Sequence, residues 1–437
     1  MEKIIKAGVL TLGCKVNQYE SDAIMRELAK NDVVIASSDD ICDIYIINTC
    51  SVTAESDRKS RQFIRRCISK NPNAVIIVTG CFAQINPEKV AKIEGVDFIC
   101  GNNAKSIIPK KALELVKNKT GIDSFIPDIY SGKFDVMEVG APITRTRAFV
   151  KIEDGCESKC AYCIIPYARG SVRSNLPENI LKEINNIAKE GCPEVVLTGI
   201  ETASYGKDFK NGYSLADLMM DVSKIDGIER IRLSSLDPSS ITPDFTDKIK
   251  ENKKVMPHFH ISMQSGNTKI LNLMRRKYNI DMAKANLDYL RKCMPGVMFS
   301  ADVITGFPGE TDEDFSKTLE FFRQEKFLHL HIFPYSKREG TPAATMKNQV
   351  EECVKKQRLH ALEEMQKVIK KELLQTFIDT NSETEVLFET FDGTYICGHT
   401  PNFIECKVPY DKRLSGKILK VKPLSTDGEY IYGKLLD

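Results

Sequence analysis

Short apolar runs that alternate with helical segments constrain the fold of this chain more than any other feature of its sequence. Six such strand candidates follow one another from residue 149 onward, at residues 149–152, 194–197, 230–233, 258–263, 297–304 and 327–333. Amphipathic segments typical of helices lie between them, for example residues 177–189 and 312–322. Repeated strand–helix units predict a parallel sheet. We therefore expect a partial (β/α)6 barrel with its functional residues at the C-terminal ends of the strands.

The first third of the chain repeats the pattern on a smaller scale. Residues 7–12, 44–47 and 74–78 are short, apolar and rich in β-branched side chains, which predicts buried parallel strands in an open α/β domain. A cysteine follows each run: Cys14, Cys50 and Cys81. Ligands of open α/β sheets bind beyond the carboxyl ends of the strands. The three thiols are therefore expected to lie together although they are far apart in sequence.

The chain has 437 residues, enough for two or three domains. We place an N-terminal α/β domain in residues 1–120, a linker in 121–141, the barrel with its trailing helices in 142–372 and a last domain in 373–437. Residues 349–377 are rich in Glu, Lys and Leu and predict a helix. The final sixty residues alternate polar and apolar side chains between Gly and Asp, which predicts a small antiparallel β-barrel.

Composition narrows the functional classes. The formal net charge is only +2, so a nucleic-acid partner would need a local basic patch. No apolar stretch approaches the roughly 18 residues of a membrane span. The short run before Cys14 is broken by Gly8 and is too short for a lipoprotein signal. We expect a cytoplasmic protein, in which the fourteen cysteines include metal ligands rather than form a disulfide scaffold.

The segment DGCESKCAYCIIPYARG carries the strongest chemical signal, because it follows the first barrel strand. Cys156, Cys160 and Cys163 have the spacing C-x3-C-x2-C, and the next cysteine is Cys192. Three thiolates can bind three irons of a cubane and leave the fourth iron open, as catalytic metal sites require. The alternatives are a zinc knuckle with a distant fourth ligand, or unrelated core cysteines.

This spacing, with Tyr162 before the third cysteine, resembles the signature of radical S-adenosylmethionine enzymes. The segments TLGCKVNQYESD, INTCSVT, VTGC, SMQSG, DVITGFPGET and FPYSKREGTPAA extend the resemblance over nearly the whole chain, to the methylthiotransferase family. The branch that the chain most resembles acts on threonylcarbamoyladenosine in tRNA. The resemblance implies an N-terminal cluster domain, a radical barrel and a C-terminal TRAM domain that binds RNA.

The family also implies cofactors and partners. Cys14, Cys50 and Cys81 would hold a second 4Fe–4S cluster beside the one on Cys156, Cys160 and Cys163. S-adenosylmethionine would act twice, as the source of a radical that removes hydrogen from an adenine carbon and as the methyl donor. The second cluster would supply the sulfur. The partners would be a tRNA anticodon stem-loop and an unidentified electron donor, and the enzyme would be a monomer.

Residues along the barrel strands and beyond their ends are candidate S-adenosylmethionine contacts, although ordinary strand-end hydrogen bonding is an equal alternative. They are Tyr162, Thr198, Gly199, Glu201, Ser234, Gln264, Asp302 and Gly306. Glu201 stands where a carboxylate could take the amino group of the ligand. Gly199 would let the backbone approach it closely.

Two groups of arginines are candidate tRNA phosphate contacts. Arg58, Arg61 and Arg65 share one face of the helix expected after Cys50, and Arg275 and Arg276 lie beyond the fourth barrel strand. A solvated surface is the alternative for both groups. From Glu383 onward nine acidic residues outnumber seven basic ones, which is not the basic surface expected of an RNA-binding domain.

Three other functions compete with the leading one. A related enzyme modifies an aspartate of a ribosomal protein, but KVNQYESD and FPYSKREGTPAA resemble the tRNA enzymes. The tRNA branch that acts on isopentenyladenosine stays open. A non-catalytic iron–sulfur RNA-binding protein would differ in not consuming S-adenosylmethionine.

Overall fold

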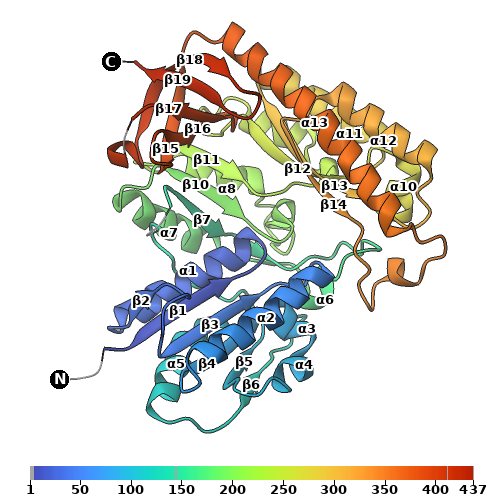
Figure 1. The fold of residues 1–437 in the computed structure, drawn as a ribbon. Helices are drawn as coiled ribbons and strands as arrows, with labels where there is room; N and C mark the ends of the chain where they lie inside the picture. The colour runs from blue at the N-terminus through green and yellow to red at the C-terminus, as the bar shows by residue number, and fades with distance from the viewer. Residues whose placement is uncertain (1–3, 143–144, 411, 437) are drawn as a thin grey trace.

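The structure, a computed structural model, describes residues 4–142, 145–410 and 412–436. Its N-terminal domain is a six-stranded parallel sheet in the order β2-β1-β3-β4-β5-β6 (Figure 1). The strands are β1 Lys6–Thr11, β2 Val34–Ala36, β3 Ile44–Thr49, β4 Val75–Gly80, β5 Phe98–Cys100 and β6 Asp123–Phe125. The three predicted strands are its centre, β1, β3 and β4. Strand β6 lies in the segment that we expected to be a linker.

Helices cover both faces of this sheet. They are α1 Lys15–Lys30, α2 Ala54–Lys70, α3 Cys81–Ile85, α4 Pro87–Ala91, the 3-10 helix η1 Lys105–Ile107 and α5 Ile108–Lys117. Strands β3 and β4 are buried along their whole length, as their continuous apolar runs predict for the middle of a parallel sheet. One apolar cluster packs α1 and α5 on the sheet and another packs α2 and α3 on the opposite face.

The central domain is a partial barrel of six parallel strands in two sheets, β7-β10-β11 and β12-β13-β14. Two isolated parallel bridges, Ile231 with Val255 and Leu236 with Ile261, join the sheets. The strands are β7 Arg147–Lys151, β10 Glu194–Thr198, β11 Arg230–Leu233, β12 His258–Gln264, β13 Met298–Thr305 and β14 His329–Pro334. The six predicted strands and their parallel order are confirmed.

The segments between these strands form the outer layer and the loops. Helices are α6 Ile165–Arg169, α7 Pro177–Lys189, α8 Leu215–Val222, α9 Pro243–Ile249, α10 Thr268–Leu273, α11 Ile280–Cys293 and α12 Asp312–Glu325. The short elements are η2 Thr202–Ser204, η3 Pro238–Ser240, η4 Pro342–Thr345 and the antiparallel pair β8 Glu153–Asp154 and β9 Arg173–Ser174. Helix α12 starts at a capping box of Thr311 and Asp314, which fixes its first turn.

Helix α13, Glu352–Thr380, packs on β14 and leads into a closed C-terminal barrel (Figure 1). The barrel has the order β15-β16-β17-β19-β18, with β15 Thr384–Phe391, β16 Ile396–His399, β17 Glu405–Val408, β18 Ile418–Thr426 and β19 Ile431–Leu435, and η5 Lys412–Leu414 before β18. The predicted barrel is confirmed, with one correction: β17 and β19 pair in parallel, so the barrel is not wholly antiparallel.

The C-terminal barrel packs against the first residues of the central strands. The guanidinium of Arg232 donates to the carbonyl oxygens of Thr400 and Pro401, both at 2.9 Å. The ring of Phe403 stacks on that of His258, with centroids 4.7 Å apart. The opposite ends of these strands are therefore left to the N-terminal domain. Among the residues that the structure describes, no helix combines the length and the apolar character that crossing a membrane requires.

Candidate active site

The first three predicted cysteines gather at one edge of the N-terminal sheet. Cys14, Cys50 and Cys81 follow β1, β3 and β4, which are neighbours in the sheet. A Cβ atom added at Gly13 would lie 3.0 Å from Sγ of Cys50. Both other thiols act electrostatically on Cys50, whose pKa rises to about 11 mainly through burial. The predicted convergence of the three thiols is therefore present in the fold.

Local geometry holds these cysteines in place. Gly80, with φ +95°, has its backbone so close to the next strand that a Cβ would meet the carbonyl oxygen of Thr49 at 2.3 Å. Nδ2 of Asn17 donates to the carbonyl oxygens of Leu12 (2.7 Å) and Thr49 (3.0 Å), which ties two cysteine loops together. Cys14 precedes α1 as its N-cap residue and makes no side-chain cap, so the positive N-terminal end of the helix faces this site.

The second cysteine triad lies at the barrel. Gly155, with φ +95°, turns the chain after β8, and Cys156, Cys160 and Cys163 follow in the loop before α6. Burial raises the pKa of Cys163 to about 12, and the thiols of Cys160 and Cys156 contribute to the same rise. Cys160 is buried and the other two are partly buried. Three neighbouring thiolates at such a site need a cation to compensate their charge, as metal ligands do.

The donor sets fit clusters better than single ions. In the described parts of the chain, no three His, Cys, Asp or Glu side chains are grouped closely enough to hold one metal ion. In a cubane each thiolate binds a different iron, so its ligands lie farther apart than those of one ion. Each triad supplies three thiols and no fourth cysteine. This suits a 4Fe–4S cluster with one open iron, while the role of each cysteine as a ligand stays a prediction.

Helix α6 connects the two triads. Sγ of Cys163 accepts the backbone N–H of Ile165 (3.4 Å), the first residue of α6. At the other end, the side-chain amide of Asn102 donates to the carbonyl oxygen of Ala168 (2.9 Å) and to Sγ of Cys81 (3.6 Å). A five-residue helix spans only about 8 Å. The two cysteine sets, from two domains, are therefore neighbours.

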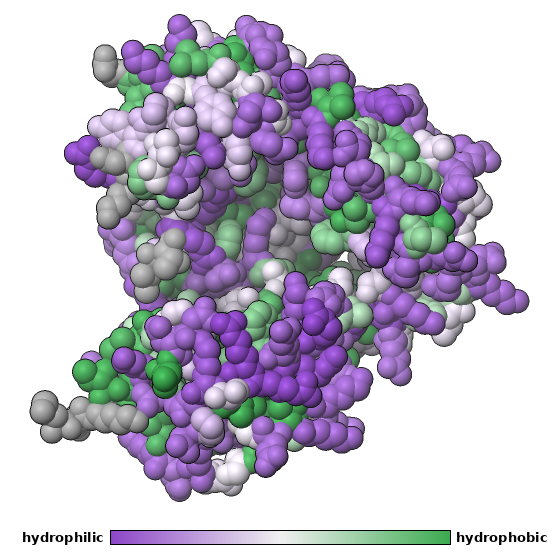
Figure 2. Space-filling view, viewed as in Figure 1, coloured by the Kyte–Doolittle hydropathy of each residue, from purple (hydrophilic) through white to green (hydrophobic). Residues whose placement is uncertain are grey.

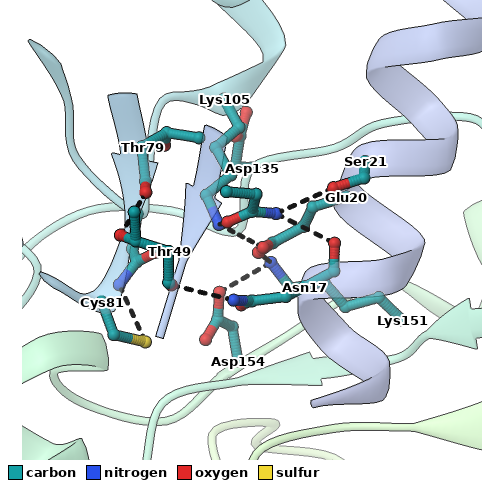
Figure 3. Close-up of polar contacts among 12 residues, drawn as sticks. Asn17, Glu20, Ser21, Thr49, Thr79, Cys81, Lys105, Asp135, Lys151 and Asp154 are labelled. Carbon is teal, nitrogen blue, oxygen red and sulfur yellow. Dashed lines mark hydrogen bonds and ion pairs between the residues drawn. The ribbon is translucent and has the colours of Figure 1, made fainter. Parts of the chain in front are cut away.

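A buried group of charges, here called the interface charge cluster, lies beside this helix. The cluster consists of Glu20 of α1, Lys105 of η1, Lys151 of β7, Asp154 of β8 and Arg169 of α6, whose side chains are all between 0% and 2% exposed. Figure 3 labels four of its members, Glu20, Lys105, Lys151 and Asp154. Arg169 donates to Glu20 (2.7 Å) and Asp154 (3.1 Å). The cluster joins the N-terminal domain to the barrel. Sequence analysis did not find it, because its members belong to five different helices and strands and most of them are far apart in sequence.

Burial and the neighbouring cations shift the pKa of Glu20 in this cluster in opposite directions. Burial alone would raise the pKa of Glu20, but Arg169, Lys105 and Lys151 outweigh it and hold that pKa well below its usual range. Three cations face two carboxylates, which leaves an excess positive charge. Arg169 also acts electrostatically on Cys14, whose pKa it lowers against the effect of burial. Its Nε is buried without a hydrogen-bond partner among the described residues.

An open space, here called the central chamber, lies between the N-terminal domain and the barrel interior. Cys14 and Lys15 are exposed to solvent, yet burial is the main cause that raises the pKa of Cys14 and lowers that of Lys15. Both therefore face a space walled by protein. Asp302 and His331, from β13 and β14, act electrostatically across it with Lys15. Figure 2 shows the surface hollowed between the N-terminal domain and the rest of the molecule.

Several predicted S-adenosylmethionine contacts lie on the loops at the barrel strand ends. The backbone N–H of Glu201 donates to the buried carboxyl of Glu153 (3.0 Å), and a Cβ at Gly199 would lie 2.6 Å from that carboxyl. Burial raises the pKa of Glu201 to about 7, and the charge of Asp237 adds to the rise. Glu153, with a pKa raised well above normal by burial, supports this loop and was missed by sequence reasoning.

The remaining predicted contacts occupy other strand ends. Thr198 is buried at the end of β10, Ser234 follows β11, and Gln264 ends β12 with φ +62°. Gly306 follows β13, and its N–H donates to Glu310 (2.7 Å). Tyr162 lies beside Phe307, with ring centroids 6.4 Å apart. Asp302 lies within β13, and its Oδ2 is 3.1 Å from Nε2 of His260. Their contact with a ligand stays a prediction.

The arginines predicted to contact tRNA differ in their exposure and in whether a protein partner already holds them. Arg65 is exposed on α2, whereas Arg58 is held by both oxygens of Glu55 and Arg61 lies over the ring of Phe82. Arg275 is exposed, with φ +60°.

Arg276 is placed differently from our expectation. Its side chain is only 6% exposed; it donates to Sγ of Cys160 (3.4 Å) and to Asp237 (2.6 Å). This guanidinium faces the barrel cysteines and is not offered to a phosphate, because the loop after α10 turns it inward.

Comparisons with known proteins show the family of this chain. Residues 150–322 match the Radical SAM superfamily, and residues 6–101 match a family described as Uncharacterized protein family UPF0004. The chain is 38% identical over 430 residues to the Bacillus subtilis protein named threonylcarbamoyladenosine tRNA methylthiotransferase MtaB, covering 98% of this chain and 95% of that one. The chain belongs to the radical S-adenosylmethionine methylthiotransferase family.

Other relatives and a solved structure extend this result. The chain is 36% identical over 428 residues to the Carboxydothermus hydrogenoformans tRNA-2-methylthio-N(6)-dimethylallyladenosine synthase, with 95% of both chains covered. The radical S-adenosylmethionine methyltransferase TsrM from Kitasatospora setae, solved with cobalamin and a [4Fe-4S] cluster, has a TM-score of 0.57 at 12% identity and covers 78% of this chain and 74% of its own. This likeness shows the fold alone. Membership of the superfamily implies one 4Fe–4S cluster and S-adenosylmethionine.

Proposed function

We propose that this enzyme converts threonylcarbamoyladenosine next to the tRNA anticodon to its 2-methylthio derivative. The observation that carries the proposal is the placement of two cysteine triads, from two domains, on either side of the five-residue helix α6. One triad would hold the cluster that works with S-adenosylmethionine, and the other a cluster that holds sulfur.

The charged lining of the central chamber favours the threonylcarbamoyl group over a dimethylallyl group. Lys15, Asp302 and His260 border the chamber, and all three are polar or ionised. A dimethylallyl group is a hydrocarbon and would be stabilised by apolar side chains, whereas a threonylcarbamoyl group is polar and carries a carboxylate. Sequence identity does not separate the two branches, since relatives of both match at similar levels.

S-adenosylmethionine, bound at the barrel cluster, would supply the radical that removes hydrogen and, in its second role, the methyl group. The chain's own residues would position the clusters and exclude water. Arg276 would hold Cys160 in position and place positive charge beside the thiolate. The interface charge cluster would keep the two cysteine sets at a fixed separation, and the N-terminal domain would exclude bulk water from the barrel opening.

We also propose that the substrate is presented as a tRNA anticodon stem-loop, with Arg65 and Arg275 as exposed candidates for phosphate contact. A monomer in the cytoplasm, served by an electron donor still to be identified, is consistent with such a substrate. The C-terminal barrel would act as the TRAM-like domain, although its connection from β16 to β17 already packs against the central strands.

Replacing Cys14, Cys50 and Cys81 with alanine tests the two-cluster proposal. Anaerobically reconstituted enzyme should hold about eight irons, by the cubane count, and the variant about four. The variant should still cleave S-adenosylmethionine to deoxyadenosine but give no methylthio product. The matched control replaces Cys156, Cys160 and Cys163 and should abolish deoxyadenosine formation as well.

Two results would overturn this assignment. One is methylthioadenosine from the folded first variant, and the other is a wild-type iron content near four. The substrate is tested separately, by mass analysis of nucleosides in tRNA from cells that lack the protein. The methylthio group should disappear from threonylcarbamoyladenosine, and its loss from isopentenyladenosine instead would assign the chain to the other branch.

A further inference from the structure

Lys15 is a cation without a protein partner at a position that matters for the reaction. It is the first residue of α1 and follows Cys14 directly. Among the residues that the structure describes, it forms no hydrogen bond or ion pair, whereas most lysines of the N-terminal domain interface are paired, such as Lys105 and Lys151 with Glu20. It is exposed to the central chamber.

The charged groups facing Lys15 from the barrel already have partners of their own. Asp302 is paired with His260 at 3.1 Å. Arg232 is paired with Glu194 at 3.0 Å, and Arg147 with Glu389.

The other titratable groups facing this space are Cys14 and the histidines of β12 and β14. Burial lowers the pKa of His258 and His331, so these imidazoles stay neutral near pH 7. Among the described residues that face this space, Lys15 is therefore the cation that lacks a counter-ion.

We propose that the ammonium of Lys15 binds the carboxylate of the threonylcarbamoyl group and so selects this nucleoside. The inference rests on the proposed function and adds a specificity residue to it. The nitrogen N6, which carries the substituent, is attached to the same six-membered ring as the carbon that receives sulfur. The group that holds the carboxylate must therefore lie close to the group that delivers sulfur, and Lys15 adjoins Cys14. A dimethylallyl group has no atom that could compensate this charge.

Two other anions could reach the same ammonium, a tRNA phosphate and the carboxylate of S-adenosylmethionine. The experiment separates them by changing the nucleoside instead of the protein alone. It uses reconstituted wild-type enzyme and Lys15→Gln, each with two anticodon stem-loops. One stem-loop carries threonylcarbamoyladenosine and the other its methyl ester, which is neutral at the same position.

The four measurements form a double-mutant cycle. Wild-type enzyme should bind the acid roughly 10- to 100-fold more tightly than the ester, as expected for a charge-assisted hydrogen bond in a partly enclosed site. Lys15→Gln should bind both stem-loops as weakly as wild-type enzyme binds the ester. The loss of affinity caused by the substitution and the loss caused by the ester should therefore not be additive. Binding is measured by fluorescence anisotropy, and kcat/KM of methylthiolation should follow the same pattern.

Two controls make the result specific. Lys110→Gln removes an exposed lysine of α5 outside the chamber and should leave both affinities unchanged. Iron content and circular dichroism of Lys15→Gln should match those of the wild type, and Lys15→Arg should retain most of the preference for the acid.

Three outcomes would overturn the inference. Lys15→Gln could weaken both stem-loops equally, which would assign the ammonium to phosphate or to S-adenosylmethionine. Lys15→Gln could also leave the affinity for both stem-loops unchanged. Finally, Lys15→Gln could lose its iron while Lys15→Arg keeps its iron and binds the acid and the ester equally. Failure of the proposed function is seen independently, as wild-type enzyme that methylthiolates an isopentenyladenosine stem-loop and not the threonylcarbamoyl one.

Discussion

Replacing Glu20 with glutamine should release the N-terminal domain from the barrel. The carboxylate of Glu20 accepts hydrogen bonds from Arg169 (2.7 Å), Lys151 (2.9 Å) and Lys105, all from other segments and all buried. Glutamine keeps the shape but removes the charge, so three buried cations would face Asp154 alone. Removing one partner from a buried ion pair costs about 3–5 kcal/mol, because the remaining charge is left uncompensated.

The effect should appear as faster amide hydrogen exchange in α1. A cost of about 3–5 kcal/mol corresponds to a roughly 100- to 5,000-fold increase in the exchange of amides protected by this docking. Exchange is the suitable assay because a chain of several domains does not unfold in one step, and because the chain has no tryptophan to report on α1. It would be measured by mass spectrometry on reconstituted protein.

Glu27→Gln on the same helix is the matched control. Glu27 pairs with Lys30 at 3.1 Å, but both side chains are about half exposed (50% and 52%). Such surface pairs contribute at most about 1 kcal/mol, so exchange in α1 should change by less than about fivefold. If Glu20→Gln changes exchange as little as Glu27→Gln, the interface charge cluster does not hold the domains together.

The difference in amide exchange between wild type and Glu20→Gln should depend on pH in a definite direction. The pKa of Glu20 in the folded chain lies well below its usual value of 4.5. A depressed pKa means that the carboxylate stabilises the fold at neutral pH and that this stabilisation is lost as the pH falls from about 4.5 through the folded value. The difference between wild type and Glu20→Gln should therefore shrink in acid.

Two further predictions concern the barrel cysteines and tRNA. Gly155→Ala should lower the iron content from about eight to about four, because a Cβ there would lie 1.9 Å from a backbone oxygen; Gly121→Ala, with a similar φ of +88° and open space, should keep about eight. An unchanged iron content in Gly155→Ala would show that this turn does not position the cysteines. Arg65→Gln should reduce the salt dependence of tRNA binding by about one unit of slope, and Arg58→Gln by less, because Arg58 is already paired with Glu55. An equal slope in Arg65→Gln and wild type would place the docking surface elsewhere.

The sequence by itself determined the three central strands of the N-terminal sheet, the six barrel strands, their parallel order and the positions of the six cysteines after them. Apolar runs such as 44–47 and 74–78 are local signals, because a buried parallel strand needs apolar side chains on both faces. The carboxyl ends of parallel strands lie at one edge of the sheet, so the order of strands and cysteines along the chain is enough to place Cys14, Cys50 and Cys81 together. The small C-terminal barrel followed from alternation, but the parallel pairing of β17 with β19 did not, since alternation carries no information on strand direction.

Only the tertiary structure decided which charges are buried and which are free. Glu20 and Arg169 are 149 residues apart, and nothing in either segment signals that they share one interior site. Arg276 belongs to a basic run that is typical of a surface, yet its guanidinium lies against Cys160. The sequence does not distinguish Lys15 from Lys151. In the structure, Lys151 is paired with Glu20 and Lys15 faces the central chamber. The periodicity of a segment predicts which of its faces is buried. It does not predict which charges are paired, because the partners of a buried charge come from segments that are distant in sequence.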